Sequence, residues 1–198
     1  MKSSDTHGRR RSKEMRLEVY GSFNCPYSLL ASRRVDRLLE LGVADVEWRA
    51  VVHDPDIALE GELVVGELAA LLDRELAEIR DLLRSGETYD VKIPLVQPNT
   101  TLAVAGFCTT TGNTANRVRA KLFDALWVQG VDIGDAHVLR ELGLPTTAPS
   151  CIAEKWRTEW VNFDRPLVPM LVLPDGTVSR GLGALKRLAD FALYGAPD

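Results

Sequence analysis

The sequence of 198 residues predicts an α/β fold whose two halves are separated by a long helical insertion. Three observations predict it. A strand, a helix and a second strand follow one another over 17–52, and a β-hairpin with a closing helix occupies 164–198. Between these halves, from 59 to 163, almost all of the chain has the apolar spacing of helices. The predicted order is therefore β-α-β, an all-helical insertion, and then β-β-α.

The first half, 15–58, is predicted to form a parallel β-α-β unit. Leu17–Tyr20 alternates apolar and polar residues as a half-buried strand does, and 46–52 repeats this alternation. The segment between the two strands carries an apolar stripe at helical spacing, and Gly42 gives it the usual C-terminal stop. Two strands joined by one helix pair in parallel, with a right-handed crossover.

The insertion, 59–163, is predicted to contain five helices with short connections. They are expected over 68–83, 101–110, 118–130, 135–142 and 150–160. Gly86 stops the first helix, and Asn99 and Thr100 are good N-cap residues for the second. Residues 93–98, which include two prolines, are predicted to form a rigid extended linker.

The second half is predicted to be a hairpin followed by a helix that ends at Gly195. A strand pattern over 168–173 is followed by Pro174–Thr177, whose residues favour a tight turn, and by a shorter strand to Arg180. Pro169 is unusual in a strand, because proline cannot donate to the hydrogen-bonded ladder. A cis peptide bond at the start of the strand, facing a site, would explain it.

Composition narrows the functional classes. With 45% hydrophobic and 26% charged residues, the chain suits a compact domain with a sizeable core. A net charge of −4 argues against non-specific nucleic-acid binding and gives no sign of membrane binding. The three cysteines have neither zinc-site nor disulfide spacing, and they predict a reduced, cytoplasmic protein. Residues 1–14 predict a disordered basic tail, and the arginines in it are not an export signal because no apolar stretch follows.

Cys25 is the candidate nucleophile, because it lies where the first strand pattern meets the first helix pattern. Pro26 fits such a junction as a first-turn helical residue, which places Cys25 at or beside the N-cap. Unpaired N–H groups and the helix dipole would then stabilise a thiolate and lower the pKa of Cys25. Ser28 can add a hydroxyl donor to the same sulfur. The alternative is that Cys25 is only a small buried residue.

Three pieces of sequence resemble the cytosolic branch of the DsbA-like thioredoxin-fold family. They are Ser22–Ser28 with its Cys-Pro-Tyr-Ser motif, Pro98–Thr100 with the later 122–135, and Val168–Pro169. The resemblance implies a thioredoxin-fold domain made of 15–58 and 164–198, interrupted by the helical insertion domain. It also implies a cis Pro169 that faces Cys25, and a Val168 backbone that pairs with the bound thiol substrate. Pro26, Tyr27 and Asn99 are the further substrate-binding or thiol-binding residues that it implies.

The chain departs from dithiol members of that family at Ser28, where they have a second cysteine. A mixed disulfide on Cys25 must therefore be resolved from outside the motif. A small thiol such as glutathione or mycothiol is the expected co-substrate, and no tightly bound cofactor or metal is expected. Cys108 and Cys151 are distant candidates for a resolving thiol, with buried packing as the alternative for both. The spacing of Trp156 and Trp160 is typical of packing, and an aromatic wall over a ligand is the alternative.

Kappa-class glutathione transferases and 2-hydroxychromene-2-carboxylate isomerases are similar too, but they carry serine where this chain has Cys25. Three hypotheses follow. The first is a monothiol thiol–disulfide oxidoreductase with Cys25 and Ser28 as catalytic residues. The second is a glutathione- or mycothiol-dependent transferase or isomerase acting on a small aromatic or polyketide-like substrate. The third is a non-catalytic binding protein. Expected partners are a small thiol and a disulfide or small organic substrate, without nucleic acid or membrane, and a homodimer is left open.

Overall fold

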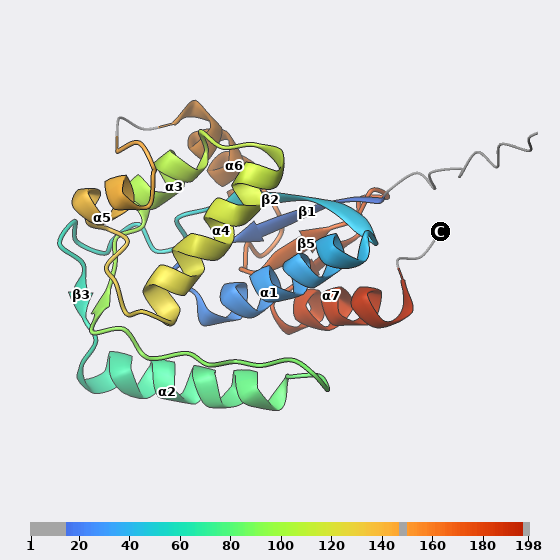
Figure 1. Ribbon diagram of the computed structural model, residues 1–198, viewed down its shortest axis with the longest axis horizontal. Helices are drawn as coiled ribbons and strands as arrows, with labels where there is room; N and C mark the ends of the chain where they lie inside the picture. Colours follow the sequence, from blue (N-terminus) through green and yellow to red (C-terminus); the bar gives the residue numbers. More distant parts are fainter. Residues whose placement is uncertain (1–14, 147–149, 196–198) are drawn as a thin grey trace, which may run out of the picture.

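The computed structural model describes residues 15–146 and 150–195, in which the elements follow the predicted order (Figure 1). The predicted basic tail, 1–14, lies outside the described residues. The first half consists of β1 (Met15–Gly21), α1 (Pro26–Leu41) and β2 (Ala44–Ala50). The insertion contains β3 (Glu62–Leu63), α2 (Gly66–Asp81), β4 (Val96–Gln97), α3 (Thr101–Phe107), α4 (Gly112–Trp127), α5 (Ala136–Glu141) and α6 (Cys151–Val161). The second half consists of β5 (Met170–Val172), β6 (Val178–Arg180) and α7 (Leu182–Tyr194).

The main sheet joins the two halves in the strand order β2-β1-β5-β6. β1 and β2 are parallel, as the β-α-β pattern predicts, and β5 and β6 form the predicted antiparallel hairpin. The two halves meet where β1 pairs antiparallel with β5, so that Glu18 lies opposite Val172. The sheet confirms the α/β fold that the sequence predicts.

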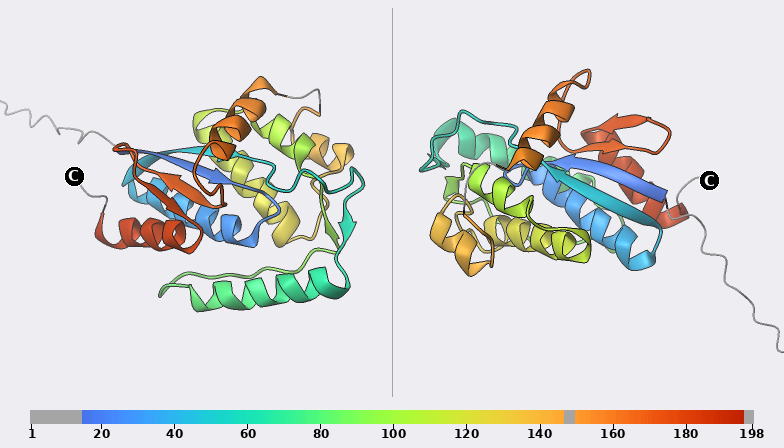
Figure 2. Two further views of the ribbon diagram at one scale, coloured as in Figure 1. Left: turned by 180° about the vertical axis from the view of Figure 1, so that it is seen from behind. Right: turned by 90° about the horizontal axis from the view of Figure 1, so that it is seen from above.

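One face of the sheet carries the main core. Leu17, Val19 and Val46 belong to a large buried cluster that includes apolar side chains of α1, α4 and α7. Figure 2 shows α1 and α7 side by side beneath the strands, while α6 crosses the ends of β1 and β2. Tyr20 and Met170, which are paired across β1 and β5, belong to a second and smaller buried cluster with Trp160 of α6.

Helix α2 and the segment that follows it are tied to α1. The Arg34 side chain is buried in α1, and its guanidinium donates to the carbonyls of Leu82 and Leu185, at 2.8 Å each. Arg34 also donates two hydrogen bonds to the Glu87 carboxylate, at 2.8 and 2.7 Å. One arginine of α1 therefore connects α7 and the segment after α2.

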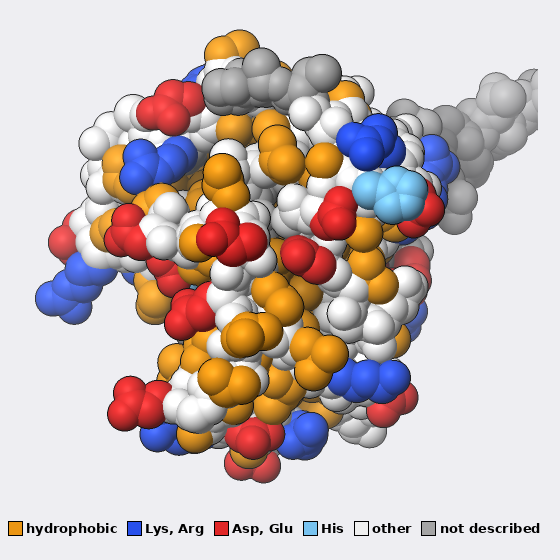
Figure 3. Space-filling view, turned by 90° about the vertical axis from the view of Figure 1, so that its left-hand side faces the viewer, with side chains coloured by type: hydrophobic (Ala, Val, Ile, Leu, Met, Phe, Trp, Pro, Cys, Tyr) orange, Lys and Arg blue, Asp and Glu red, His pale blue; other side chains and the backbone are white. Residues whose placement is uncertain are grey.

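The insertion contains a short ribbon that the sequence analysis did not predict. Residues 93–98 were predicted to form a rigid extended linker, and in the structure β4 within them pairs antiparallel with β3. Exposed apolar side chains gather on the face of the molecule that carries this ribbon (Figure 3). The ribbon and its flanks contribute Leu59, Leu63, Val65 and Leu95, which are 66–83% exposed.

Pro169 does not interrupt the sheet. The Val168–Pro169 peptide bond is cis, as predicted, and β5 begins only at Met170. The carbonyl of Pro169 accepts a hydrogen bond from the N–H of Gly181 at 2.8 Å, which ties it to the start of α7. None of the described helices combines the length and the apolar character that crossing a bilayer requires.

Candidate active site

Cys25 occupies the N-cap of α1 and Pro26 is the first helical residue, which confirms the position predicted from the sequence. The Cys25 backbone N–H donates to the carbonyl of Ser22 at 3.2 Å, and its carbonyl accepts from the N–H of Leu29 at 3.2 Å. The residue is 8% exposed, so the thiol is close to the surface but largely shielded from water.

The loop before Cys25 is fixed by side chains of α1 and α4. The hydroxyl of Ser28 accepts a hydrogen bond from the N–H of Ser22 at 3.2 Å. The Ser22 hydroxyl donates to the Asn24 side-chain oxygen at 2.6 Å, and the indole N–H of Trp127 donates to the carbonyl of Phe23 at 2.8 Å. Because these groups are buried, the loop has few other ways to satisfy its polar atoms.

The second cluster brings Cys25 together with the residue before the cis proline. Its buried members are Tyr20, Cys25, Val51, Trp160, Val168 and Met170. These residues come from β1, from the loop after β2, from α6 and from the start of the β5 hairpin. Cys25 and Val168, the residue before the cis proline, therefore belong to one buried cluster. That Pro169 faces Cys25 stays a prediction. Pairing of the Val168 backbone with a thiol substrate remains a prediction.

Helix α2 and the segment after it contribute acidic and phenolic groups near the start of α1. The hydroxyl of Tyr27 donates to Glu78 of α2 at 2.6 Å, and the hydroxyl of Tyr89 donates to the carbonyl of Pro26 at 2.9 Å. Glu75, one turn before Glu78, is half-buried, and burial together with the charge of Glu78 raises the pKa of its carboxyl group.

These surroundings correct the expected ionisation of Cys25. Burial raises the pKa of the Cys25 thiol above its ordinary value, and the nearby charge of Glu75 raises it further. Hydrogen bonds from the Ser28 hydroxyl and from the backbone N–H groups of Ser28 and Tyr27 lower the pKa, but they do not compensate for burial. The lowered pKa predicted for Cys25 from the helix N-terminus alone is therefore wrong.

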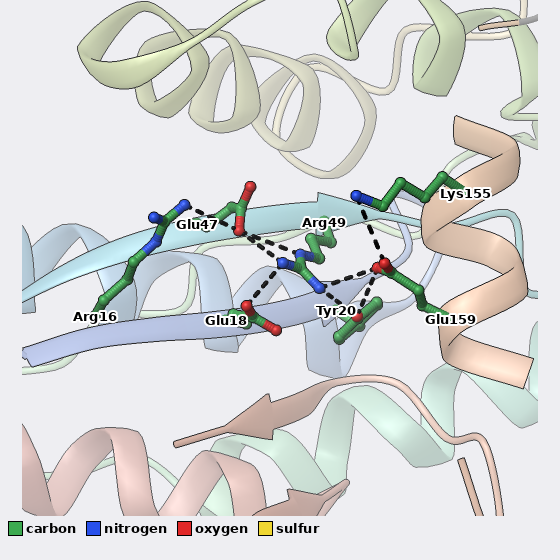
Figure 4. Close-up of polar contacts among 7 residues, drawn as sticks. All are labelled: Arg16, Glu18, Tyr20, Glu47, Arg49, Lys155 and Glu159. Carbon is green, nitrogen blue, oxygen red and sulfur yellow. Dashed lines mark hydrogen bonds and ion pairs between the residues drawn. The ribbon is translucent and has the colours of Figure 1, made fainter. Parts of the chain in front are cut away.

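Helix α6 is held against the sheet by a charged network around Arg49 of β2 (Figure 4). The Arg49 guanidinium contacts Glu18 at 2.7 Å, Glu47 at 2.8 Å and Glu159 of α6 at 3.0 Å. It also donates to the hydroxyl of Tyr20 at 2.6 Å, and that hydroxyl donates to Glu159 at 3.3 Å. The network fixes the residue that directly precedes Trp160 in the sequence.

Asn99 is placed by contacts with the backbone. Its side-chain N–H donates to the carbonyl of Ile57 at 2.6 Å, and its side-chain oxygen accepts from the N–H of Thr101 at 3.0 Å. The second bond satisfies an N–H at the start of α3, although the N-cap residue itself is Thr100. Asn99 thus fixes the entry to α3, and its predicted contact with a thiol or substrate stays a prediction.

Cys108 and Cys151 lie away from the cluster of Cys25. Cys108 is buried at the C-cap of α3, where burial raises the pKa of its thiol to about 11. Cys151 is exposed at the first residue of α6. Neither is among the residues of the Cys25 cluster, so the structure gives no contact that would let them resolve a Cys25 adduct directly.

Sequence reasoning missed Glu75, Tyr89 and Arg49 as neighbours of the site. No local motif marks them, because each reaches the site from an element distant in the sequence. The apolar stripe of α2 could be recognised in the sequence. It does not show that Glu75 lies near the start of α1, because the packing of α2 against α1 is known only from the structure. Trp160 was noted for its spacing from Trp156, and the structure places it in the smaller cluster, of which Cys25 is also a member.

Comparisons with known proteins agree with the fold. Residues 16–148 match the model of a family described as the DSBA-like thioredoxin domain. A search of curated proteins finds no match.

Solved structures share the fold at low sequence identity. A 2-hydroxychromene-2-carboxylate isomerase is 18% identical, with a TM-score of 0.66 over 89% of this chain and 93% of that one. A probable DsbA oxidoreductase from Streptomyces coelicolor is 17% identical, with a TM-score of 0.61 over 93% of both chains. The cytosolic disulfide reductase DsbM from Pseudomonas aeruginosa, solved with glutathione, is 16% identical, with a TM-score of 0.56 over 90% of this chain and 96% of that one.

Proposed function

Because the chain belongs to the DSBA-like thioredoxin family, we propose that it is a thiol–disulfide oxidoreductase that uses Cys25 alone and an external small thiol. The observation that carries the proposal is the position of Cys25. It caps α1 and shares a buried cluster with Val168, the residue before the cis proline. The Cys-Pro-Tyr-Ser motif has no second thiol, so the partner thiol must come from solution.

The reaction requires two exchange steps at Cys25. In the first, the Cys25 thiolate attacks one sulfur of a substrate disulfide, forms a mixed disulfide and expels the other sulfur as a thiolate. In the second, the thiolate of a small thiol attacks its partner sulfur in the adduct and expels Cys25 as a thiolate. One substrate sulfur is thereby released as a thiolate, and the other leaves in a mixed disulfide with the small thiol. A second small thiol then displaces it, so that two small thiols end as one disulfide and protons return to both released substrate thiolates.

Ser28 supports both steps in this proposal. Its hydroxyl and backbone N–H hydrogen-bond to the Cys25 sulfur and favour the thiolate that attacks and later leaves. Pro26 and Tyr27 shape the entrance beside the sulfur, while Val168 and Pro169 offer backbone to the bound thiol. Asn99 completes the thiol-binding set that we propose.

Glutathione or mycothiol is the proposed co-substrate, and the cytoplasm is the proposed location. The glutathione-bound cytosolic reductase that shares the fold supports both proposals. Both thiols are present in excess only in a reducing compartment, where such a co-substrate can regenerate Cys25.

The mass of the intact protein tests the proposal directly. Wild type and Cys25→Ser are incubated with oxidised glutathione or mycothiol disulfide. We expect a single thiol adduct on wild type, absent from Cys25→Ser and reversed by excess reduced thiol. Adducts that persist in Cys25→Ser would assign the reaction to another cysteine. No adduct and no thiol binding would favour a non-catalytic binding protein.

The raised pKa of Cys25 favours a second candidate function. A thiol that keeps its proton can donate a hydrogen bond, as a serine hydroxyl does, to the thiolate of a bound glutathione or mycothiol. The protein would then be a transferase or isomerase acting on a small aromatic or polyketide-like substrate. Isomerisation of 2-hydroxychromene-2-carboxylate, with reduced glutathione added, is the first assay. Activity that survives Cys25→Ser would support this candidate over the redox reaction.

A further inference from the structure

Trp160 is a buried donor without a partner. Trp160 is 8% exposed, and its indole N–H has no hydrogen-bond partner among the described residues. Burying a donor without an acceptor costs about 1–3 kcal/mol, which is why such groups are uncommon in folded proteins. An unpaired donor therefore calls for an explanation at its position.

The position is the cluster that contains Cys25. Trp160 and Cys25 are both buried members of it, together with Val168. Trp160 cannot easily move away, because the residue before it, Glu159, is bonded to Arg49 at 3.0 Å and accepts from Tyr20 (Figure 4). The charged network thus holds Trp160 in the cluster that contains Cys25.

The buried members of the cluster make no hydrogen bond with the indole N–H. Besides Cys25, Tyr20 is its one polar side chain among the described members, and its hydroxyl already accepts from Arg49 and donates to Glu159. Val51, Val168 and Met170 contribute apolar side chains. The acceptor that would satisfy Trp160 must therefore come from a molecule that enters the cluster.

We propose that the indole N–H of Trp160 binds a carbonyl or carboxylate oxygen of the ligand that reacts at Cys25. The inference rests on the proposed function, because it needs a ligand at that sulfur. It makes Trp160 a specificity-determining residue, which favours ligands that carry an oxygen acceptor close to their reacting sulfur. Glutathione, which carries carbonyls and carboxylates, fits this class, and an alkyl disulfide that carries only amines does not.

The chain contains natural controls for this role. It has four tryptophans, and the indole N–H of Trp127 is already bonded to the carbonyl of Phe23 at 2.8 Å. Trp48 is buried with an unpaired N–H like Trp160, but it belongs to the main core. Trp156 lies on the same helix and also packs against the Cys25 cluster, with its ring close to Phe107. Among the four indole N–H groups, only that of Trp160 should gain a hydrogen bond from a ligand at Cys25.

The experiment compares two adducts of the full chain by proton–nitrogen correlation spectra. Cys25 is loaded with oxidised glutathione in one sample and with cystamine, which has no oxygen acceptor, in the other. The indole resonances are assigned from spectra of the four Trp→Phe variants. We expect the glutathione adduct to move the Trp160 proton downfield, as a new hydrogen bond does, and the cysteamine adduct to leave it in place.

A second measurement gives the size of the effect. Thiol-exchange equilibria yield the stability of each adduct in wild type, Trp160→Phe and Trp156→Phe. Loss of the donor should weaken the glutathione adduct about tenfold relative to the cysteamine adduct in Trp160→Phe. The ratio of the stabilities of the glutathione and cysteamine adducts should be unchanged in Trp156→Phe.

The outcomes separate this inference from the proposed function. If adducts form and the Trp160 resonance responds equally to both, or to neither, the inference is overturned and the function stands. If neither disulfide forms an adduct on Cys25, the proposed function is overturned, and the inference falls with it because its ligand is lost. The spectra of wild-type adducts decide the matter even where Trp160→Phe is poorly folded.

Discussion

At the scale of single residues, the Cys25 thiol is subject to opposing influences. Burial and the carboxylate of Glu75 favour the thiol, while hydrogen bonds from Ser28 and Tyr27 favour the thiolate. The sequence predicted the N-cap position correctly, because Pro26 and the apolar stripe of α1 are local features. It could not predict the burial, because Trp160 and Glu75 approach Cys25 only in the folded chain.

Ser28→Ala should raise the pKa of Cys25 and destabilise the protein. The substitution removes a hydroxyl that donates to the sulfur and accepts from the buried N–H of Ser22. Leaving that N–H unpaired costs about 1–3 kcal/mol. The pH profile of Cys25 alkylation should shift to higher pH, and urea unfolding should show the loss. Ser32→Ala, also buried in α1, is the matched control, and an unshifted profile in Ser28→Ala would contradict the assigned role.

Glu75→Gln should have the opposite effect on Cys25. Removing the carboxylate takes away a negative charge that disfavours the thiolate, so the pKa of Cys25 should fall. Alkylation of Cys25 should then reach its half-maximal rate at a lower pH than in wild type. Glu67→Gln, the same change on an exposed residue at the start of α2, should leave the profile where it is. A profile that moves equally in both variants would show a general charge effect.

At the scale of elements, the position of α6 is set by charges that the sequence pattern does not reveal. The helix itself was predicted over 150–160, and in the structure Ser150 caps it by accepting from the N–H of Ile152. Its docking depends on Arg49 and Glu159, which are far apart in the sequence. Periodicity predicts where a helix begins and ends, and the residues that hold it against the sheet come from other elements.

Arg49→Met should loosen α6 from the sheet. The change keeps the aliphatic stem but leaves Glu18, Glu47 and Glu159 without their common partner. Because the three carboxylates are partly exposed, we expect a loss of about 1–3 kcal/mol in the free energy of unfolding, below the value for a fully buried pair. Arg16→Met, which removes a single exposed contact with Glu47, should cost less than about 0.5 kcal/mol. Equal losses in the two variants would argue against a role for Arg49 in docking.

At the scale of the whole molecule, the order of elements and the cis proline followed from local patterns, whereas the contacts between the halves did not. Pro169 was conspicuous because proline is rare in strands, so one residue predicted a long-range feature. The ribbon of β3 and β4 was missed because two-residue strands leave no alternation to detect. Arg34, which connects α1, α7 and the segment after α2, was missed because an apolar stripe does not mark a buried arginine.

Acid should weaken the contacts by which Arg34 connects α1, α7 and the segment after α2, because one of its partners is the carboxyl group of Glu87. Burial acts to raise the pKa of Glu87, but hydrogen bonds and charge from Arg34 outweigh it and hold the pKa below its usual range. A carboxyl group whose pKa is lowered by folding stabilises the protein above its unfolded pKa of about 4.3, and that contribution is lost as the pH falls through the folded value.

Glu87→Gln should therefore cost about 2 kcal/mol at neutral pH and progressively less in acid. Urea unfolding at neutral pH and below pH 4 measures the difference between variant and wild type. The exposed Glu60, changed in the same way, should show no such convergence. If the difference in the free energy of unfolding between wild type and Glu87→Gln stays constant with pH, the ion pair of Arg34 and Glu87 does not contribute to the pH dependence of stability.

The strand order also bears on how the chain is made. β1 is the first strand to be synthesised, yet one of its two edges is covered only when β5 arrives, with Glu18 opposite Val172. At the usual rate of about 5–20 residues per second, the whole insertion is translated while that edge is still open. An unpaired strand edge is prone to join another chain. The nascent protein should therefore depend on the ribosome, or on a chaperone, until its C-terminal hairpin emerges.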